Sequence, residues 1–274
     1  MELITLVDNV CEHPDLVSEH GLSILIKING RHLLCDMGKS DAFIDNAVVL
    51  GVDLKKIDFA VLSHGHNDHS GGLPRFLEIN STAKVYLSHD VLNERYFSTR
   101  HGDCREISTD VDACKPYLDR MVMVEDSCWL SDDIALVRTQ NRNFPTPKGN
   151  NFLFTRVRES LHKDDFSHEL ALAIKTGRGL VVISPCSHCG AINIMNSCRE
   201  FTAVEKVSAF VGGLHFVDCN ATQREVSQFI QDLNDNYPDT EIYTGHCTSD
   251  RAKQLLSASS THIHIFSTGS IISN

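Results

Sequence analysis

The segment Leu62–Leu73, with the sequence LSHGHNDHSGGL, places four side chains that can ligate metal within positions 64–69: His64, His66, Asp68 and His69. A turn that leaves a strand can direct two imidazoles separated by one residue at one metal ion, and the following Asp and His at a second ion. Imidazole and carboxylate ligands suit Zn(II), Fe(II), Mn(II) or Co(II). The segment therefore predicts a binuclear site and leaves the identity of the metal open.

Further histidines follow short apolar runs elsewhere in the chain. The metal motif comes directly after Asp58–Leu62, and three more runs precede His188, His215 and His246: Leu180–Ser184, Val207–Val211 and Glu241–Thr244. Each run is typical of a buried strand. Open α/β folds bind ligands at the carboxyl ends of their strands, where loops converge without disturbing the sheet. We therefore expect these histidines to gather at one edge of the fold.

Turn and capping signals define other elements. Asn29-Gly30 separates the apolar runs Ser23–Ile28 and His32–Asp36 and favours a type I′ hairpin turn. Asp41 is a candidate cap for a helix that ends near Leu50, before Gly51. Tyr96–Lys115 and Arg138–Asn151 are polar and are predicted to be loops that form a lid or a wall of the substrate site.

The composition of the 274-residue chain is that of a globular protein, with 42% hydrophobic and 22% charged residues. Its net charge of −11 opposes binding to nucleic acid or to anionic membranes. The acidic N-terminal stretch has no signal-peptide pattern, and no apolar run approaches the roughly 18 residues of a spanning helix. We expect one domain over residues 1–274, a cytoplasmic location, reduced cysteines and a small-molecule substrate. A homo-oligomer is left open.

Several segments together resemble the metallo-β-lactamase superfamily, in particular the metal-dependent hydrolase branch that includes the archaeal dihydropterin–ribofuranosylaminobenzene phosphate synthases. Besides the metal motif, the matching segments are LVDN at 6–9, SEHGLSILI at 18–26, LLCDMG at 33–38, CSHCGAINI at 186–194, GGLHF at 212–216 and YTGHCT at 243–248. The resemblance implies an α/β fold of the αββα type, in which two central mixed β-sheets are flanked by helices and the metals lie in a cleft at one edge.

The resemblance also implies a ligand set. His64 and His66 would hold the first metal with His188, and the second metal would be held by Asp68, His69 and His246. Cys186 stands where many members of the superfamily have a bridging Asp. His215 would face the cleft and contact substrate, or bind metal if His188 does not.

Alternative roles exist for several of these residues. His188 could instead cap a helix that begins near Ile192, and Cys186 with Cys189 forms a CxxC pair that could be a redox dithiol. Asp36 could orient a ligand histidine or cap a helix. His20 could reach the cleft, although a surface position is preferred. His168-Glu169 could be a ligand pair, although a solvated turn is preferred.

The leading functional interpretation is a hydrolase that uses hydroxide activated by two metals, most simply Zn(II), with Mn(II) or Fe(II) as alternatives. Asp68 would act as ligand and hold the reacting water, and His215 would contact a phosphate-containing or ester-like substrate. One alternative is a transferase of the synthase type named above. Another is a non-hydrolytic di-metal redox or binding protein.

Overall fold

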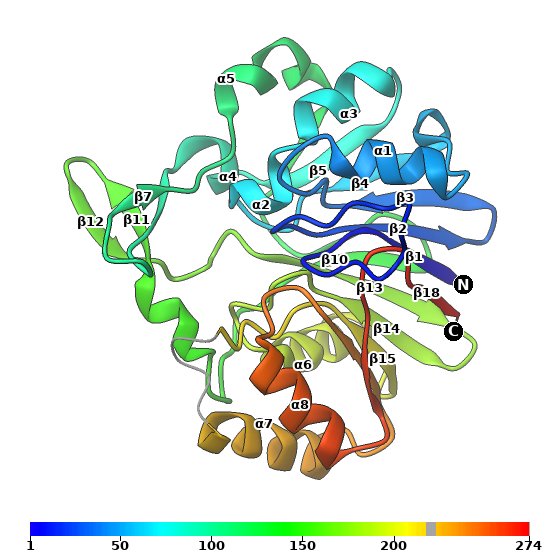
Figure 1. Ribbon diagram of the computed structural model, residues 1–274, viewed down its shortest axis with the longest axis vertical. Coiled ribbons are helices and arrows are strands. Elements are labelled where there is room, and N and C mark those ends of the chain that lie inside the picture. The colour runs from blue at the N-terminus through cyan, green and yellow to red at the C-terminus, as the bar shows by residue number, and fades with distance from the viewer. Residues whose placement is uncertain (218–222, 274) are drawn as a thin grey trace.

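The computed structural model describes residues 1–217 and 223–273 and consists of two seven-stranded sheets that pack face to face between layers of helices (Figure 1). Above the first sheet in this view lie α1 (Ala42–Val49) and α3 (Leu73–Ile79). Below the second sheet lie α6 (Ala191–Thr202), α7 (Gln223–Asn236) and α8 (Asp250–Ser259). This arrangement confirms the predicted αββα sandwich.

The first sheet has the order β18-β1-β2-β3-β4-β5-β8. Its strands are β18 (Ile271–Ser273), β1 (Glu2–Val7), β2 (Ser23–Ile28), β3 (Arg31–Cys35), β4 (Phe59–Val61), β5 (Lys84–Ser88) and β8 (Met121–Val124). The strands from β18 to β3 pair antiparallel, whereas β3, β4, β5 and β8 pair parallel. The sheet is therefore mixed, and the metal motif leaves the carboxyl end of β4 in its parallel part.

The second sheet has the order β17-β16-β15-β14-β13-β10-β9. Its strands are β17 (Ile263–Ile265), β16 (Glu241–Thr244), β15 (Val207–Val211), β14 (Gly179–Ile183), β13 (Leu170–Thr176), β10 (Ile134–Arg138) and β9 (Cys128–Trp129). The strands β14, β15, β16 and β17 are parallel. Their carboxyl ends therefore lie at one edge of the sheet, as predicted from the apolar runs that are each followed by a histidine.

Three hydrophobic clusters define the layers. Alternation along β2 sends Ile24 and Ile26 into the cluster between the two sheets and Leu25 into the cluster beneath α1 and α3. In the second sheet, Val181 joins the central cluster and Val182 the cluster beneath α6, α7 and α8. Both faces of each sheet are thus buried, which explains why these strands read as continuous apolar runs.

The hairpin prediction is confirmed, because β2 and β3 are joined at Asn29 and Gly30, whose φ values of 50° and 77° are those of a type I′ turn. The predicted cap of α1 is wrong in detail. Asp41 is the N-cap residue, but it has a helical backbone and its side chain makes no capping hydrogen bond.

The prediction that 96–115 is a loop is wrong in part. A small sheet of order β12-β11-β6-β7 projects beside the sandwich, at the left of Figure 1. It contains β6 (Tyr96–Ser98), β7 (Arg105–Glu106), β11 (Leu153–Val157) and β12 (Ser160–Lys163). These short pieces pair with residues distant in sequence, so polarity and length alone could not identify them.

The remaining helices are short. They are α2 (Asn67–Ser70), α4 (Asp90–Asn93), α5 (Val111–Cys114), and the 3₁₀ turns η1 (Leu54–Lys56), η2 (Lys115–Arg120) and η3 (Lys148–Phe152). Within residues 1–217 and 223–273, no helix is both long and apolar enough to cross a membrane. The nine cysteines in the described part of the chain are all free thiols, as expected, and Cys219 lies outside the described residues.

Candidate metal centre

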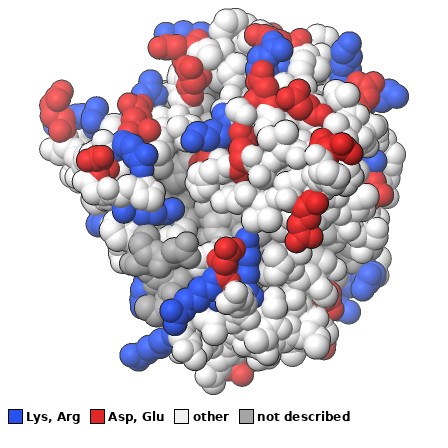
Figure 2. Space-filling model, in the orientation of Figure 1, with Lys and Arg blue, Asp and Glu red and all other residues white. Residues whose placement is uncertain are grey.

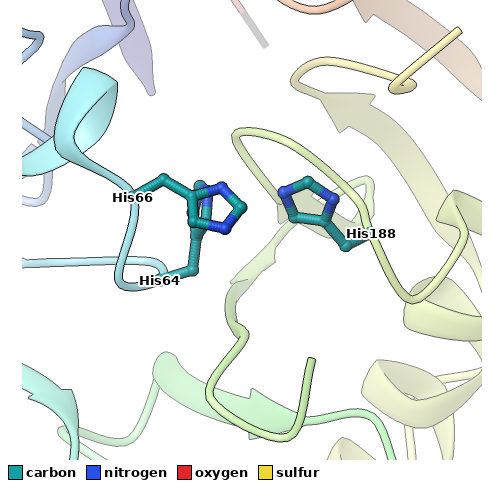
Figure 3. A group of neighbouring side chains, drawn as sticks. All are labelled: His64, His66 and His188. Atoms are coloured by element: carbon teal, nitrogen blue, oxygen red, sulfur yellow. The ribbon is translucent and has the colours of Figure 1, made fainter. Parts of the chain in front are cut away.

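Three imidazoles converge where the two halves of the sandwich meet. His64 and His66 lie on the loop after β4, and His188 lies on the loop after β14 (Figure 3). His64 Nε2 faces His66 Nδ1 at 3.1 Å, and one ring nitrogen from each of the three residues falls within a span of 4.8 Å. All three side chains are buried. The structure thus brings together the three ligands predicted for the first metal.

A carboxylate and two imidazoles form a second group beside the first. The Asp68 Oδ2 atom lies 3.8 Å from His69 Nε2 and 3.5 Å from His246 Nε2. Ligand atoms bound about 2 Å from one tetrahedral zinc ion lie roughly 3 to 3.5 Å apart, so these separations are close to those of a ligand set. His246 comes from the loop after β16, so this group also joins the two halves.

Cys186 lies between the two groups. Its thiol forms compact sets with His64 and His69, with His188 and His215, and with His246 and Cys247, each within 4.8 Å. The structure therefore places the Cys186 sulfur next to side chains of both groups, and its role as a bridging ligand stays a prediction. The geometry gives no support to the alternative dithiol interpretation, because Cys189 turns its thiol toward the Phe166 carbonyl, 3.7 Å away.

Hydrogen bonds fix the ligands that come from the first half. Asp36 accepts hydrogen bonds from the Ser63 N–H and hydroxyl and from His69 Nδ1, all at 2.7 Å. The Ser63 hydroxyl also lies 2.8 Å from His64 Nδ1. The Nε2 atoms of His64 and His69 are consequently the ones available to a metal. The predicted role of Asp36 in orienting a ligand histidine is the one its contacts support.

The ligands from the second half are held in the same way. Asn9 Oδ1 lies 2.7 Å from His246 Nδ1, and Asn150 Oδ1 lies 3.1 Å from His188 Nδ1. Both histidines therefore present Nε2 to the cleft. The N-cap of α6 is Gly190, so the helix-cap interpretation of His188 is wrong.

His168 and Glu169 do not form a solvated turn, and that prediction is wrong. Both side chains are buried. His168 Nδ1 accepts a hydrogen bond from the Gly65 N–H, and the Glu169 carboxylate accepts bonds from the backbone N–H groups of His188 and Cys189. The two residues, which directly precede β13, therefore support both ligand loops. This role depends on contacts between segments that are distant in the sequence, so the sequence alone did not reveal it.

Burial sets the charge state of these imidazoles. It lowers the pKa of His66 to about 4 and lowers the pKa values of His64 and His188 well below their usual range. Burial alone would raise the pKa of Asp68, but the electrostatic interaction with His69 and the hydrogen bond from His246 outweigh it and hold that pKa well below its usual range. Neutral imidazoles and an ionised carboxylate are the forms that bind metal.

Buried imidazole nitrogens without hydrogen-bond partners indicate whether a metal ion fits between these side chains. His69 Nε2 and His188 Nε2 are buried and have no hydrogen-bond partner among the described residues. A buried polar atom without a partner costs about 1 to 3 kcal/mol, so several in one cluster need an explanation. A metal bonded to these nitrogens would satisfy them. The donors present therefore fit two ions of the kind that imidazole, carboxylate and thiolate bind.

His215 lies beside the cluster, with its ring centroid 4.3 Å from that of His188. Arg100 donates a hydrogen bond to His215 Nε2 at 3.1 Å. That nitrogen is therefore occupied, whereas His215 Nδ1 is buried and has no hydrogen-bond partner among the described residues. The contact of His215 with substrate stays a prediction. The backbone of His215 has a φ of 52°, in the left-handed region, which marks a constrained position.

Sequence reasoning missed Cys247 and undervalued His20. The Cys247 thiol lies 3.0 Å from His246 Nε2, and His20 Nε2 lies 3.3 Å from Asp68 Oδ2. His20 is both half-exposed and in the cleft, so the preferred surface position describes only part of its environment. The adjacency of Cys247 to His246 in the sequence was the available signal.

The cleft over the cluster has a volume of about 280 Å³ and is lined in part by basic side chains. These are Lys39, Arg100 and Arg105. Besides Asp68, the lining contains the acidic residue Glu106, which is paired with Arg95 at 3.4 Å. Figure 2 shows Lys and Arg atoms on both sides of the hollow left of the centre of this face. A protein with a net charge of −11 thus has basic side chains around its group of candidate metal ligands.

Comparison with known proteins identifies the class. The family model of the metallo-beta-lactamase superfamily matches residues 18–111, which include the metal motif. The chain superimposes on the crystal structure of Tm1679, a metal-dependent hydrolase of the beta-lactamase superfamily, with a TM-score of 0.83 and 27% identity, covering 100% of this chain and 99% of that one. Human tRNase Z, short form, shares the fold at 11% identity with a TM-score of 0.57. The chain therefore has the metallo-β-lactamase fold, and its residues 18–111 match the family model of that superfamily.

The chain is also similar in sequence to a relative with a named activity. The chain is 28% identical over 253 residues to 7,8-dihydropterin-6-methyl-4-(beta-D-ribofuranosyl)-aminobenzene-5'-phosphate synthase of Methanocaldococcus jannaschii, an alignment that covers 87% of this chain and 84% of the synthase. The predicted resemblance to this branch is confirmed.

Proposed function

We propose that the protein is a metal-dependent hydrolase that acts on a small phosphate-containing or ester-like molecule. The observation that carries the proposal is the convergence of buried ring nitrogens and the Asp68 carboxylate on one cleft with a basic rim. Two bound metal ions would supply Lewis acidity and lower the pKa of bound water. Zn(II) suits the donors best, with Mn(II) or Fe(II) as alternatives. A cytoplasmic location and a possible homo-oligomer remain predictions.

The protein's own groups divide the work. Asp68 Oδ2 lies within reach of His20, His69 and His246, so its carboxylate can hold a reacting water in one orientation. Arg100 and Arg105 line the cleft and offer charged N–H donors to phosphate oxygens, which guanidinium groups bind in a bidentate manner. Arg100 also holds His215, which therefore faces substrate in a fixed position.

A screen of the metal-loaded protein against phosphodiester, phosphomonoester, lactone and thioester substrates tests this function. Turnover should disappear with chelator and return with Zn(II) or Mn(II), and Asp68→Asn should reduce kcat by at least about a hundredfold. Arg100→Ala should raise KM for phosphate substrates more than for the lactone. Full turnover by metal-free protein would contradict the proposal.

A second candidate is a synthase, favoured by the alignment with the archaeal synthase. Hydrolysis in oxygen-18 water places the label in a product within one turnover. A synthase that joins two substrates does not add water, so the joined product and the released leaving group would both stay unlabelled. The isotope result therefore separates the two reactions on the same site.

A further inference from the structure

Cys247 presents its thiol to the second group of metal-binding atoms. Its sulfur lies 3.0 Å from His246 Nε2 and forms one compact set with Cys186 and His246, and another with His20 and Asp68, each within 4.8 Å. The side chain is buried, yet it lines the cleft rather than a hydrophobic cluster. A thiol that only filled space would lie among apolar side chains, as that of Cys198 in α6 does.

The backbone holds Cys247 in this orientation. Its φ of 52° lies in the left-handed region, which a residue with a side chain rarely adopts without constraint. The neighbouring loop is tightly packed, since a Cβ on Gly213 would lie 2.2 Å from the His246 carbonyl oxygen. The Thr248 hydroxyl accepts a hydrogen bond from the Leu214 N–H at 3.1 Å. The end of β15 therefore fixes the loop that directs the thiol into the cleft.

Cys186 provides a second sulfur in contact with the first. Its thiol lies close to side chains of both groups of candidate ligands. The next residue, Ser187, has a φ of 58° in the left-handed region, so this turn is also constrained. The Cys186 thiol hydrogen-bonds to the Cys247 sulfur. Two sulfurs, three imidazoles of the first group and the Asp68, His69 and His246 side chains thus form one continuous donor set.

We propose that Cys247 joins Cys186, which the resemblance already implies as a ligand, as a second thiolate ligand of the binuclear centre. Cys186 bridges the two ions, and Cys247 binds the second ion with Asp68, His69 and His246. Each thiol releases its proton to solvent when the metal binds. Because thiolates are soft ligands, the centre selects Zn(II) over Mn(II) and Mg(II). The inference rests on the metal site of the proposed function but not on any particular reaction.

X-ray absorption of the zinc-loaded protein tests the proposal, because Zn–S bonds of about 2.3 Å are distinct from Zn–N bonds of about 2.0 Å. A bridging and a terminal thiolate give about 1.5 sulfurs per zinc on average, falling to about 1 in Cys247→Ala and about 0.5 in Cys186→Ala. Cys198→Ala removes a buried cysteine far from the cleft and should leave the spectrum unchanged. Absence of sulfur in the wild-type spectrum would overturn the proposal even if the variants failed to fold.

Metal competition gives an independent reading. Cys247→Ala should lower Zn(II) affinity by at least about tenfold and Mn(II) affinity by much less, since only zinc gains from a soft ligand. Equal losses for the two metals would contradict the selectivity. If sulfur ligates the metal but no substrate is hydrolysed, this inference holds and the proposed function fails. If a centre without sulfur ligands hydrolyses substrate, the proposed function holds and this inference fails.

Discussion

The two halves of the molecule supply the candidate ligands in different ways. The first half provides His64, His66, Asp68 and His69 from one loop after β4, ending in α2. The second half provides its side chains from three separate strand ends, those of β14, β15 and β16. Local chain geometry therefore positions the first set, whereas the pairing of parallel strands positions the second. A site built in this way forms only when both sheets are in place.

The largest expected effect comes from breaking the alignment of strand ends in the second half. A Cβ on Gly212, whose φ is 149°, would lie 1.8 Å from the Ser184 carbonyl oxygen and force β14 and β15 apart. We expect Gly212→Ala to lower the free energy of unfolding by at least about 3 kcal/mol. Gly177→Ala, with no atom within 4 Å of its Cβ, should change it by less than about 0.5 kcal/mol. Denaturant titration measures both, and equal effects would contradict the argument.

Acid should destabilise the metal-free protein through the buried histidines whose pKa is lowered, which include His66 and His188. The pKa of His66 is lowered by burial from about 6.5 to about 4, so between these values the unfolded chain binds protons that the folded chain does not. The free energy of unfolding therefore falls as the pH falls through this window, by about 3 kcal/mol for His66 alone. Denaturant melts of chelator-treated protein across the window measure the change. A flat profile would show that these imidazoles are not buried in neutral form.

A buried carboxylate stabilises a ligand loop in each half: Asp36 in the first and Glu169 in the second. The two carboxylates accept hydrogen bonds from different kinds of group. Asp36 bonds a ligand imidazole, whereas Glu169 bonds the backbone N–H groups of His188 and Cys189. Asp36→Asn should cost about 2 kcal/mol of stability and about 10- to 100-fold in metal affinity. Glu169→Gln should cost similar stability with a smaller loss of affinity. Calorimetric metal titration compares the variants, and a larger loss of affinity for Glu169→Gln would reverse our assignment.

The smallest expected effect concerns helix capping. The Ser249 side chain accepts a hydrogen bond from the Ala252 N–H at the start of α8, whereas Asp41 makes no such bond at the start of α1. Ser249→Ala should therefore cost about 1 kcal/mol and Asp41→Ala less than about 0.5 kcal/mol. Thermal melts of the two variants provide the comparison. Equal shifts would mean that the capping bond contributes nothing.

The same contrast explains what the sequence could predict. The hairpin at Asn29-Gly30 and the strand Val207–Val211 follow from local signals and agree with the structure. The metal motif is equally local, so its four side chains could be nominated from spacing alone. The strands could be predicted because both of their faces are buried, which leaves continuous apolar runs, whereas the αββα arrangement followed from the resemblance to the superfamily.

The remaining features depend on contacts between distant segments. The burial of His168 and Glu169 arises from bonds to Gly65 and to the turn at 188–189. The position of Cys247 depends on packing against Gly213, and the β6–β11 pairing joins segments more than fifty residues apart. Sequence spacing carries no information about such distances, so these features required the structure.

Metal content of variants from each half tests most directly the claim that both halves build one binuclear centre. We predict two ions per chain by elemental analysis of the wild-type protein. His64→Ala and His188→Ala should lose the same first ion, and Asp68→Ala and His246→Ala the same second ion, although the members of each pair come from opposite halves. Full occupancy in the His188 and His246 variants, with loss only in the His64 and Asp68 variants, would contradict the account.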